Sequence, residues 1–254
     1  MTANKTTSRP FLLLQLRPET TASDDEYAAF LGKGGLSPDE TVRMRLDQQD
    51  LPTDIDLDAY AGVIVGGGPG CVSDPPAKKS AVETRIEQQC LAFMPEIIER
   101  DIPFLGACYG IGILAHYLGA TVSKERFSEP VGTSACAIEH ADPLLDGVPR
   151  TFDAFVGHKE AVQSLPMGAT HLVSSPTCPI QMIRVGDNVY ATQFHPEADA
   201  AVFETRIEVY RDYGYFPPET AAQLIEECRA ANVTAPQRIL SNFVRRYRTA
   251  PPRR

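Results

Sequence analysis

The residue best suited to covalent chemistry is Cys108, in the segment Gly106–Gly110 with the sequence GACYG. An apolar run precedes it and an apolar helical segment follows, the order typical of an elbow that lifts a nucleophile clear of a sheet. The two glycines let the backbones of strand and helix approach closely. Because a helix N-terminus favours the thiolate, we predict a nucleophile that attacks a carbonyl carbon; the alternative is a buried structural thiol.

A base for this nucleophile is predicted at His195, at the end of an extended segment. Glu197 follows two residues later, and alternation along a strand places both side chains on one side. A carboxylate beside an imidazole fixes the tautomer of a general base. A surface ion pair is the alternative interpretation of this pair. His158 and Glu160 form a similar pair in a loop, and we expect a structural or weakly substrate-facing role for His158.

Two glycine-rich segments are possible ligand cradles. Residues 66–70 (GGGPG) follow a predicted strand, so their N–H groups can point at a ligand; an ordinary strand-to-helix loop is the alternative. Residues 32–35 (GKGG) lack the preceding strand and the Lys-Ser/Thr end of a phosphate-binding loop, and we expect a flexible loop there.

The elements that position these residues alternate between strands and helices. Short apolar or alternating runs predict strands at residues 11–16, 41–46, 61–65, 101–107, 130–138, 151–156, 171–175, 180–184 and 188–194. Spacings of three and four predict helices at 79–100, after Cys108, and at 202–210, 219–230 and 236–247. This order predicts an α/β fold with a three-layer, doubly wound, mostly parallel sheet and an antiparallel extension. We expect one domain over 1–254, with a core at about 10–200 and a C-terminal helical extension at about 201–250.

Composition excludes several classes of protein. The net charge of −9 argues against a nucleic-acid partner. No apolar run approaches the ~20 residues of a membrane span, and the polar N-terminal residues lack a signal-peptide core. The six cysteines form no Cys-x-x-Cys pair and no zinc-type spacing. We therefore expect a reduced cytoplasmic protein that needs no metal or cofactor.

Three motifs resemble those of the class I glutamine amidotransferases. Gly106–Gly110 matches the elbow Gly-x-Cys-x-Gly, and residues 194–197 match Phe-His-Pro-Glu, 87 positions from cysteine to histidine. Residues 67–69 resemble the oxyanion strand. Within the class, residues 203–206 (FETR) and 215–218 (YFPP) resemble stand-alone proteins similar to the amidotransferase half of GMP synthase.

The resemblance implies roles for individual residues. Cys108 would attack the side-chain amide of glutamine, His195 would carry the proton, and Glu197 would orient His195. The N–H groups of Gly68 and Tyr109 would hold the oxyanion, beside Gly67. The family commonly has a glutamine where this chain has Gly112, which puts the choice of substrate in question, and Glu129 opens a segment resembling a substrate-facing loop.

Three functions follow as expectations. The first is hydrolysis of a γ-glutamyl amide through a thioester on Cys108, with release of ammonia. The second is a γ-glutamyl peptidase acting on a conjugate, favoured by Gly112, and the third is a binding or regulatory module without turnover. The Ser-Gly-Gly-x-Asp-Ser nucleotide loop of a synthetase is absent from the sequence, so we expect any ammonia acceptor on a partner synthetase.

Overall fold

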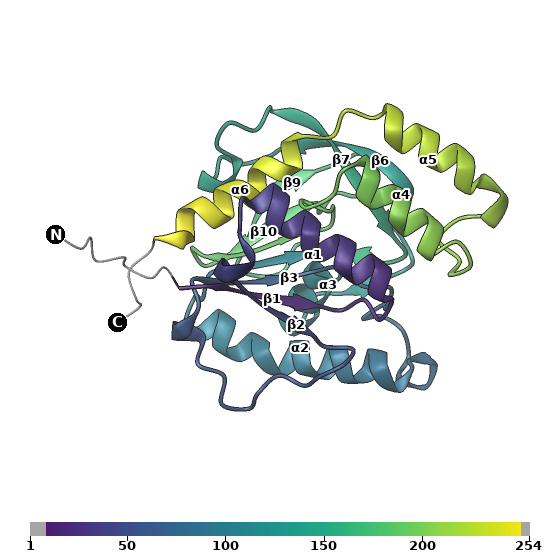
Figure 1. Ribbon diagram of the computed structural model, residues 1–254. Coiled ribbons are helices and arrows are strands. Elements are labelled where there is room, and N and C mark those ends of the chain that lie inside the picture. Colours follow the sequence, from purple (N-terminus) through teal and green to yellow (C-terminus); the bar gives the residue numbers. More distant parts are fainter. Residues whose placement is uncertain (1–8, 250–254) are drawn as a thin grey trace.

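The computed structural model describes residues 9–249 (Figure 1). Six α-helices occur in this range: α1 Thr20–Gly34, α2 Ala81–Glu99, α3 Tyr109–Tyr117, α4 Ala200–Val209, α5 Ala221–Ala230 and α6 Ala235–Arg248. The strands are β1 Phe11–Gln15, β2 Thr41–Arg45, β3 Gly62–Val65, β4 Phe104–Ala107, β5 Val122–Ser123, β6 Glu129–Ile138, β7 Thr151–His158, β8 Ala161–Val162, β9 Ala169–Ser174, β10 Met182–Val185 and β11 Val189–Thr192.

Nine of these strands form one mixed sheet in the order β2-β1-β3-β4-β11-β10-β9-β6-β7. The first five strands of this order are parallel to one another. From β11 onward every pairing is antiparallel. β5 and β8 form a separate antiparallel pair. The predicted α/β fold with an antiparallel extension is confirmed, and the parallel strands β4 and β11 deliver the two predicted catalytic segments side by side.

The central strands are apolar on both faces, which gives the sheet two cores. Leu12 and Leu14 of β1 belong to a core shared with α2 and α3. Phe11 and Leu13 face the opposite way, into a core shared with α1 and α6. Successive side chains of a strand point to opposite faces, so an unbroken apolar run requires helices on both sides. Figure 1 shows α2 along one side of the sheet and α1 with α6 along the other.

Helix α1 corrects one expectation from the sequence. A flexible loop is expected at residues 32–35, but residues 32–34 are the last turn of α1. Gly35 is the left-handed C-cap, with φ of 65°, and its N–H donates to the carbonyl of Leu31. A glycine adopts this conformation without a Cβ clash, so the glycines mark a helix end here.

The C-terminal helices serve different parts of the fold. Helices α4 and α5 form a third apolar cluster together with Phe155 of β7, beside the antiparallel end of the sheet. Helix α6 instead packs Phe243 against Phe11 of β1, with ring centroids 6.1 Å apart. The expected helices near the C-terminus are therefore present, while the division into a core and an extension of one domain stays a prediction.

Candidate active site

The chain turns sharply at Cys108 between β4 and α3. Cys108 has φ of 52° and ψ of −92°, a backbone conformation that is rare for residues other than glycine. Strain of this kind costs about 1–3 kcal/mol and is typical of functional sites. Its N–H donates to the carbonyl of Thr192 at 2.7 Å, which ties the turn to the end of β11. A Cβ at Gly106 would lie 3.0 Å from the backbone of Gly110, so the close approach predicted for the elbow is present.

His195 lies just beyond the end of β11. Its N–H donates to the carbonyl of Phe155, and its Nδ1 lies 3.0 Å from Oε1 of Glu197. Both side chains are almost completely buried, at 3% and 0% exposure, which excludes an exposed surface ion pair. With Nδ1 held by the carboxylate, Nε2 is left to exchange a proton with another group.

The three motifs meet at Gly67. A Cβ placed on Gly67 would lie 2.8 Å from Cε1 of His195 and 3.6 Å from Cβ of Cys108. Cys108 and His195 also line one cavity of about 40 Å³, together with Gly68. The three segments therefore lie together around Gly67, while the catalytic roles of the residues stay predictions.

Cys108 and His195, the candidate nucleophile and base, are both uncharged at neutral pH. Burial raises the pKa of the Cys108 thiol to about 12, although Arg17 and Arg206 act in the opposite direction. Burial, together with the positive charge of Arg206, lowers the pKa of His195 to about 4. Burial therefore outweighs the effect of the helix N-terminus, and the two side chains are a neutral thiol and a neutral imidazole.

Glu197 is an anion held by two partners. Burial alone would raise its pKa, but the neighbouring His195 and Arg206 lower it well below the ordinary value. Nη2 of Arg206 donates to Oε1 of Glu197 at 2.7 Å. The carboxylate beside the imidazole thus also accepts a hydrogen bond from a buried guanidinium of α4.

Gly68 and Tyr109, the expected oxyanion donors, both border a cavity that reaches Cys108. Gly68 lines all three of the cavities described here. Tyr109 is the first residue of α3, where the N–H has no intrahelical acceptor. Their role as donors stays a prediction.

Gly112 borders a second small cavity, which also reaches Cys108. A Cβ at Gly112 would lie 3.4 Å from Oε1 of Glu160, so the Glu160 carboxylate occupies the space next to the glycine. Glu160 is 8% exposed and accepts the N–H groups of Val72 and Ser73 at 2.7 and 2.8 Å. Within residues 9–249 no ion pair with a cation is found for this carboxylate.

The structure places Glu129 away from the walls of these cavities. One carboxylate oxygen accepts the hydroxyls of Ser134 and Thr177, and the other accepts Nε2 of His158 at 2.9 Å and Nε2 of Gln181 at 2.6 Å. These contacts lower its pKa to about 2 despite burial. His158, the hydrogen-bond partner of Glu129, lines the Gly112 cavity. The position facing the cavity, which was expected for Glu129, is therefore that of His158.

Glu129, His158 and Cys178 lie close enough together to be considered as metal ligands, with their ligand atoms within 4.8 Å of one another. His158 Nδ1 contacts the carbonyl of Glu160, and Nε2 is occupied by Glu129. The hydrogen bonds described for this cluster thus already use both nitrogens of the imidazole, and the cluster supports the loop that carries Glu160.

A third cavity, with a volume of about 460 Å³, lies beside residues 68–70. It shares Gly68, Gly70 and Tyr109 with the Gly112 cavity. Its walls combine apolar side chains such as Leu16 with charged groups such as Glu83. A binding space much larger than a water molecule is therefore next to the candidate nucleophile.

Sequence reasoning missed four residues: Arg17, Arg206 and Tyr215, which line the cavity shared by Cys108 and His195, and Glu26, which pairs with both arginines. Arg17 directly follows a buried strand, which was the available signal for it. Arg206 and Tyr215 belong to the FETR and YFPP segments, which carry only a resemblance. Glu26 lies on α1, a helix that the sequence reasoning did not find, so nothing pointed to it.

None of the helices within residues 9–249 has the length and the apolar character needed to cross a membrane.

Comparison with known proteins gives relatives of two sizes. The glutamine-hydrolyzing GMP synthase of Thermosipho melanesiensis is 33% identical over 147 residues, which cover 57% of this chain and 26% of that protein. This chain thus matches about a quarter of the length of that relative. The shorter relative, one subunit of the glutamine-hydrolyzing GMP synthase of Thermoplasma acidophilum, is 28% identical over 158 residues, covering 61% of this chain and 73% of that one.

The fold has solved counterparts as well. A crystal structure of a glutamine amidotransferase from Thermotoga maritima has a TM-score of 0.75 and 20% identity, covering 95% of this chain and 99% of that one. At this identity the likeness concerns the fold alone. The family model described as glutamine amidotransferase class-I matches residues 39–208, well over half of the chain. This chain therefore belongs to the class I glutamine amidotransferase family.

Proposed function

We propose that the protein hydrolyses a γ-glutamyl amide, with glutamine as the simplest substrate, through a thioester on Cys108. The observation that carries the proposal is the convergence at Gly67 of Cys108 and of the His195–Glu197 pair. A nucleophile, a base and an orienting carboxylate are the groups that acyl transfer requires. Membership of the amidotransferase family supports the same assignment.

In the proposed reaction, Nε2 of His195 takes the proton of the Cys108 thiol as sulfur attacks the γ-carbonyl carbon. The oxyanion forms beside the N–H groups of Gly68 and Tyr109; a donor of this kind is typically worth about 3 kcal/mol of barrier. His195 then gives the proton to the leaving nitrogen, the C–N bond breaks, and ammonia departs. Water, deprotonated by His195, attacks the thioester to release glutamate and restore the thiol.

We assign recognition of the α-amino group of the γ-glutamyl substrate to the cavity beside Gly112. Glu160 is a buried carboxylate held by two backbone N–H groups. A buried anion is costly without a positive partner, so the α-ammonium group of a γ-glutamyl substrate is a suitable ligand for it. Other members of the family commonly have a glutamine at the position of Gly112. In this interpretation Glu160 makes the substrate contacts of that glutamine, and Gly112 leaves space for the Glu160 carboxylate.

The ammonia would pass to a partner synthetase. The Thermoplasma acidophilum relative is named as one subunit of a glutamine-hydrolyzing GMP synthase, which suggests such a division of labour for that protein. The sequence of this chain lacks a nucleotide loop of the Ser-Gly-Gly-x-Asp-Ser type, so we place the acceptor site outside these 254 residues. A cytoplasmic location remains part of this proposal.

A second candidate, a γ-glutamyl conjugate hydrolase, is favoured by the 460 Å³ cavity. Free glutamine leaves this cavity unfilled, whereas a conjugate carries a larger group that could occupy it. The two candidates share the chemistry at Cys108 and differ only in the leaving amine.

Labelling with a glutamine-like chloroketone, followed by intact-mass measurement, tests the proposal. We expect one adduct in the native protein and none in Cys108→Ser. Cys228→Ser is a matched control that keeps the adduct, because Cys228 is a free thiol buried in the apolar cluster of α4 and α5. Release of ammonia from glutamine and of amine from γ-glutamyl conjugates then separates the two candidates. Absence of any adduct and of any release would favour a binding module.

A further inference from the structure

The buried side chain that links the two halves of the site is Glu26 on α1. It is 0% exposed. Its Oε2 accepts Nε of Arg17 at 2.7 Å and lies 3.6 Å from Nη2 of Arg206. Its Oε1 accepts Nε2 of Gln15 at 3.2 Å. One carboxylate thus holds two guanidinium groups, one from the turn after β1 and one from α4.

The Arg206 branch leads to the base. Nη2 of Arg206 donates to Glu197 at 2.7 Å, and Glu197 lies 3.0 Å from Nδ1 of His195. From Glu26 to Glu197 the charges therefore alternate in sign, and each buried group is paired with the next. Removing one member of such a chain leaves an unpaired buried charge.

The Arg17 branch leads to the nucleophile and the oxyanion segment. A Cβ at Gly67 would lie 2.7 Å from Nη2 of Arg17, so the guanidinium rests directly against this segment. Arg17 lines the cavity that contains Cys108. The Glu26 carboxylate is closer still to the preceding residue, since a Cβ at Gly66 would overlap Oε1. Glu26 and Arg17 together therefore support the backbone of residues 66–67.

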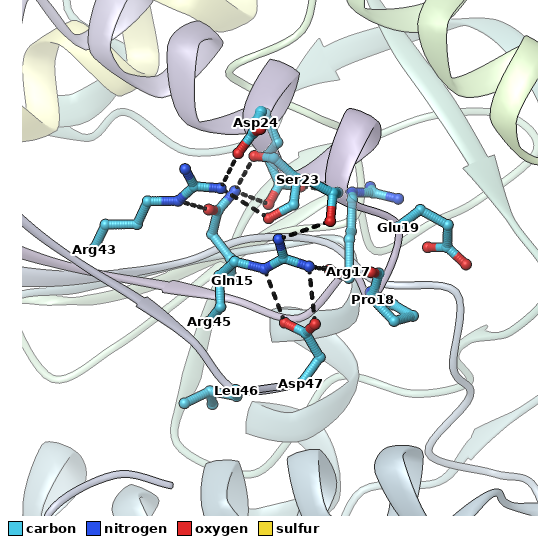
Figure 2. A network of polar contacts seen from close by, with 12 residues as sticks. Gln15, Arg17, Pro18, Glu19, Ser23, Asp24, Arg43, Arg45, Leu46 and Asp47 are labelled. Atoms are coloured by element: carbon cyan, nitrogen blue, oxygen red, sulfur yellow. Dashed lines mark hydrogen bonds and ion pairs between the residues drawn. The ribbon is translucent and has the colours of Figure 1, made fainter. Parts of the chain in front are cut away.

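Gln15, which donates to the Glu26 carboxylate, belongs to a polar network that joins β1, β2 and α1 (Figure 2). Nε of Arg43 donates to Oε1 of Gln15 at 2.5 Å, while Nε2 of Gln15 faces α1. Arg45 donates to the carbonyl of Pro18 at 3.0 Å, which fixes the chain just after Arg17. The strand β2 thus holds the β1–α1 connection in one conformation, and Arg17 and Glu26 have little freedom to move apart.

We propose that Glu26 is a positioning residue that couples the acid–base half of the site to its oxyanion half through Arg206 and Arg17. This inference rests on the proposed function for its effect on turnover. Its effect on the reactivity of Cys108 does not need turnover, because alkylation of the thiol depends only on the groups around it.

Several groups besides Glu26 determine the charge around the Cys108 sulfur. Arg17 and Arg206 favour the thiolate, whereas Glu197 and Glu160 oppose it. The other titratable side chains that border the two cavities of Cys108 are Cys71, Tyr109, His158, Lys159, His195, Tyr210 and Tyr215. Glu26 contacts both arginines that favour the thiolate, so its substitution changes the balance without removing any group from these cavities.

The test compares Glu26→Gln with Glu26→Asp and with Glu204→Gln. Glu204 is a matched control on α4, because it pairs with Arg229 at the surface. We expect Glu26→Gln to lower kcat for the γ-glutamyl amide at least tenfold with KM nearly unchanged. The lost anion leaves a more positive site, so alkylation of Cys108 by iodoacetamide should shift to lower pH. Glu26→Asp should recover the native pH profile in part.

A folded Glu26→Gln variant with native kcat and a native alkylation profile would overturn the proposal. Should Glu26→Gln fail to fold by circular dichroism, Arg17→Lys and Arg206→Lys are measured singly and together. Residues that act through one carboxylate give non-additive losses, and additive losses would contradict the coupling. Failure of the proposed function gives a different result. The native protein would then release no ammonia or amine, while the pH profile of Cys108 alkylation would still differ between the native protein and Glu26→Gln.

Discussion

Replacing Gly67 by alanine tests whether the three motifs meet as closely as the structure indicates. Gly67 does not have a left-handed backbone, so alanine brings no backbone strain and adds only one methyl group. That methyl would lie 2.8 Å from Cε1 of His195 and 2.7 Å from Nη2 of Arg17. Carbon atoms prefer separations of about 3.5–4.0 Å, so the imidazole must retreat by about 1 Å.

A displacement of this size has a known scale of effect. A misplacement of about 1 Å in a reacting group can cost about 100-fold in rate. A 100-fold loss corresponds to about 2.7 kcal/mol of barrier. We therefore expect Gly67→Ala to lower kcat for the γ-glutamyl amide about 100-fold. The fold should persist, because the methyl contacts side chains that border a cavity.

The matched control is Gly32→Ala on α1, which lies outside the cavities that reach Cys108. A methyl group at Gly32 would meet nothing within 4 Å, and alanine suits the interior of a helix, so we expect native activity. Ammonia release and iodoacetamide alkylation of Cys108 are measured for both variants, with thermal unfolding as the folding check. Native kcat and native alkylation in a folded Gly67→Ala protein would refute the convergence at Gly67.

Three further predictions concern stability and access. The pKa of Glu129 is lowered to about 2, so its contribution to stability is present above the ordinary carboxyl pKa and is lost as the pH falls toward 2. Denaturant titrations at several pH values should therefore show that the unfolding free energy of Glu129→Gln falls less steeply with decreasing pH than that of the native protein. Asp101 has φ of 48° and accepts two backbone N–H groups and a side-chain amide, so Asp101→Ala should lower the unfolding free energy by about 2–4 kcal/mol, whereas an unchanged denaturation midpoint would contradict this. Tyr215 borders both cavities that reach Cys108, so Tyr215→Ala should speed alkylation of Cys108 while Tyr213→Ala should not; equal rates in the two variants would count against this role.

The sequence was sufficient for the parts of the site that depend on local geometry. A strand, a cysteine and a helix flanked by glycines predict the elbow, because few other arrangements need small residues at those positions. The two-residue spacing of His195 and Glu197 predicts imidazole and carboxylate on one side, and the structure has them 3.0 Å apart. Apolar runs predict the strands of the sheet for the same reason, since burial on both faces leaves a continuous pattern.

The parts that could not be predicted depend on contacts between distant segments. Glu26, Arg17 and Arg206 come from α1, from the turn after β1 and from α4, and no spacing in the sequence links them. The glycines at the end of α1 led to a wrong prediction because a C-cap and a flexible loop require the same residue. The effect of burial on the pKa of Cys108 was beyond sequence reasoning for a related reason: its cavity is closed by side chains such as Tyr215, which lie far away in the sequence.

In the proposed reaction, the charges around Cys108 require the base and the positioning groups to act together. Arg17 and Arg206 favour the thiolate, yet burial keeps the pKa of the thiol at about 12. The proposed attack therefore starts from a neutral thiol, whose proton moves to His195. Imidazolium would form beside Glu197, while the substrate oxygen would gain negative charge near Gly67, which lies against Arg17. The charge of Arg206 by itself disfavours the imidazolium, because it lowers the pKa of His195, so the contribution we propose for Arg206 is to hold Glu197 in place. Arg17 and Glu197 thus lie where charge would develop in the transition state, which is the condition for electrostatic catalysis.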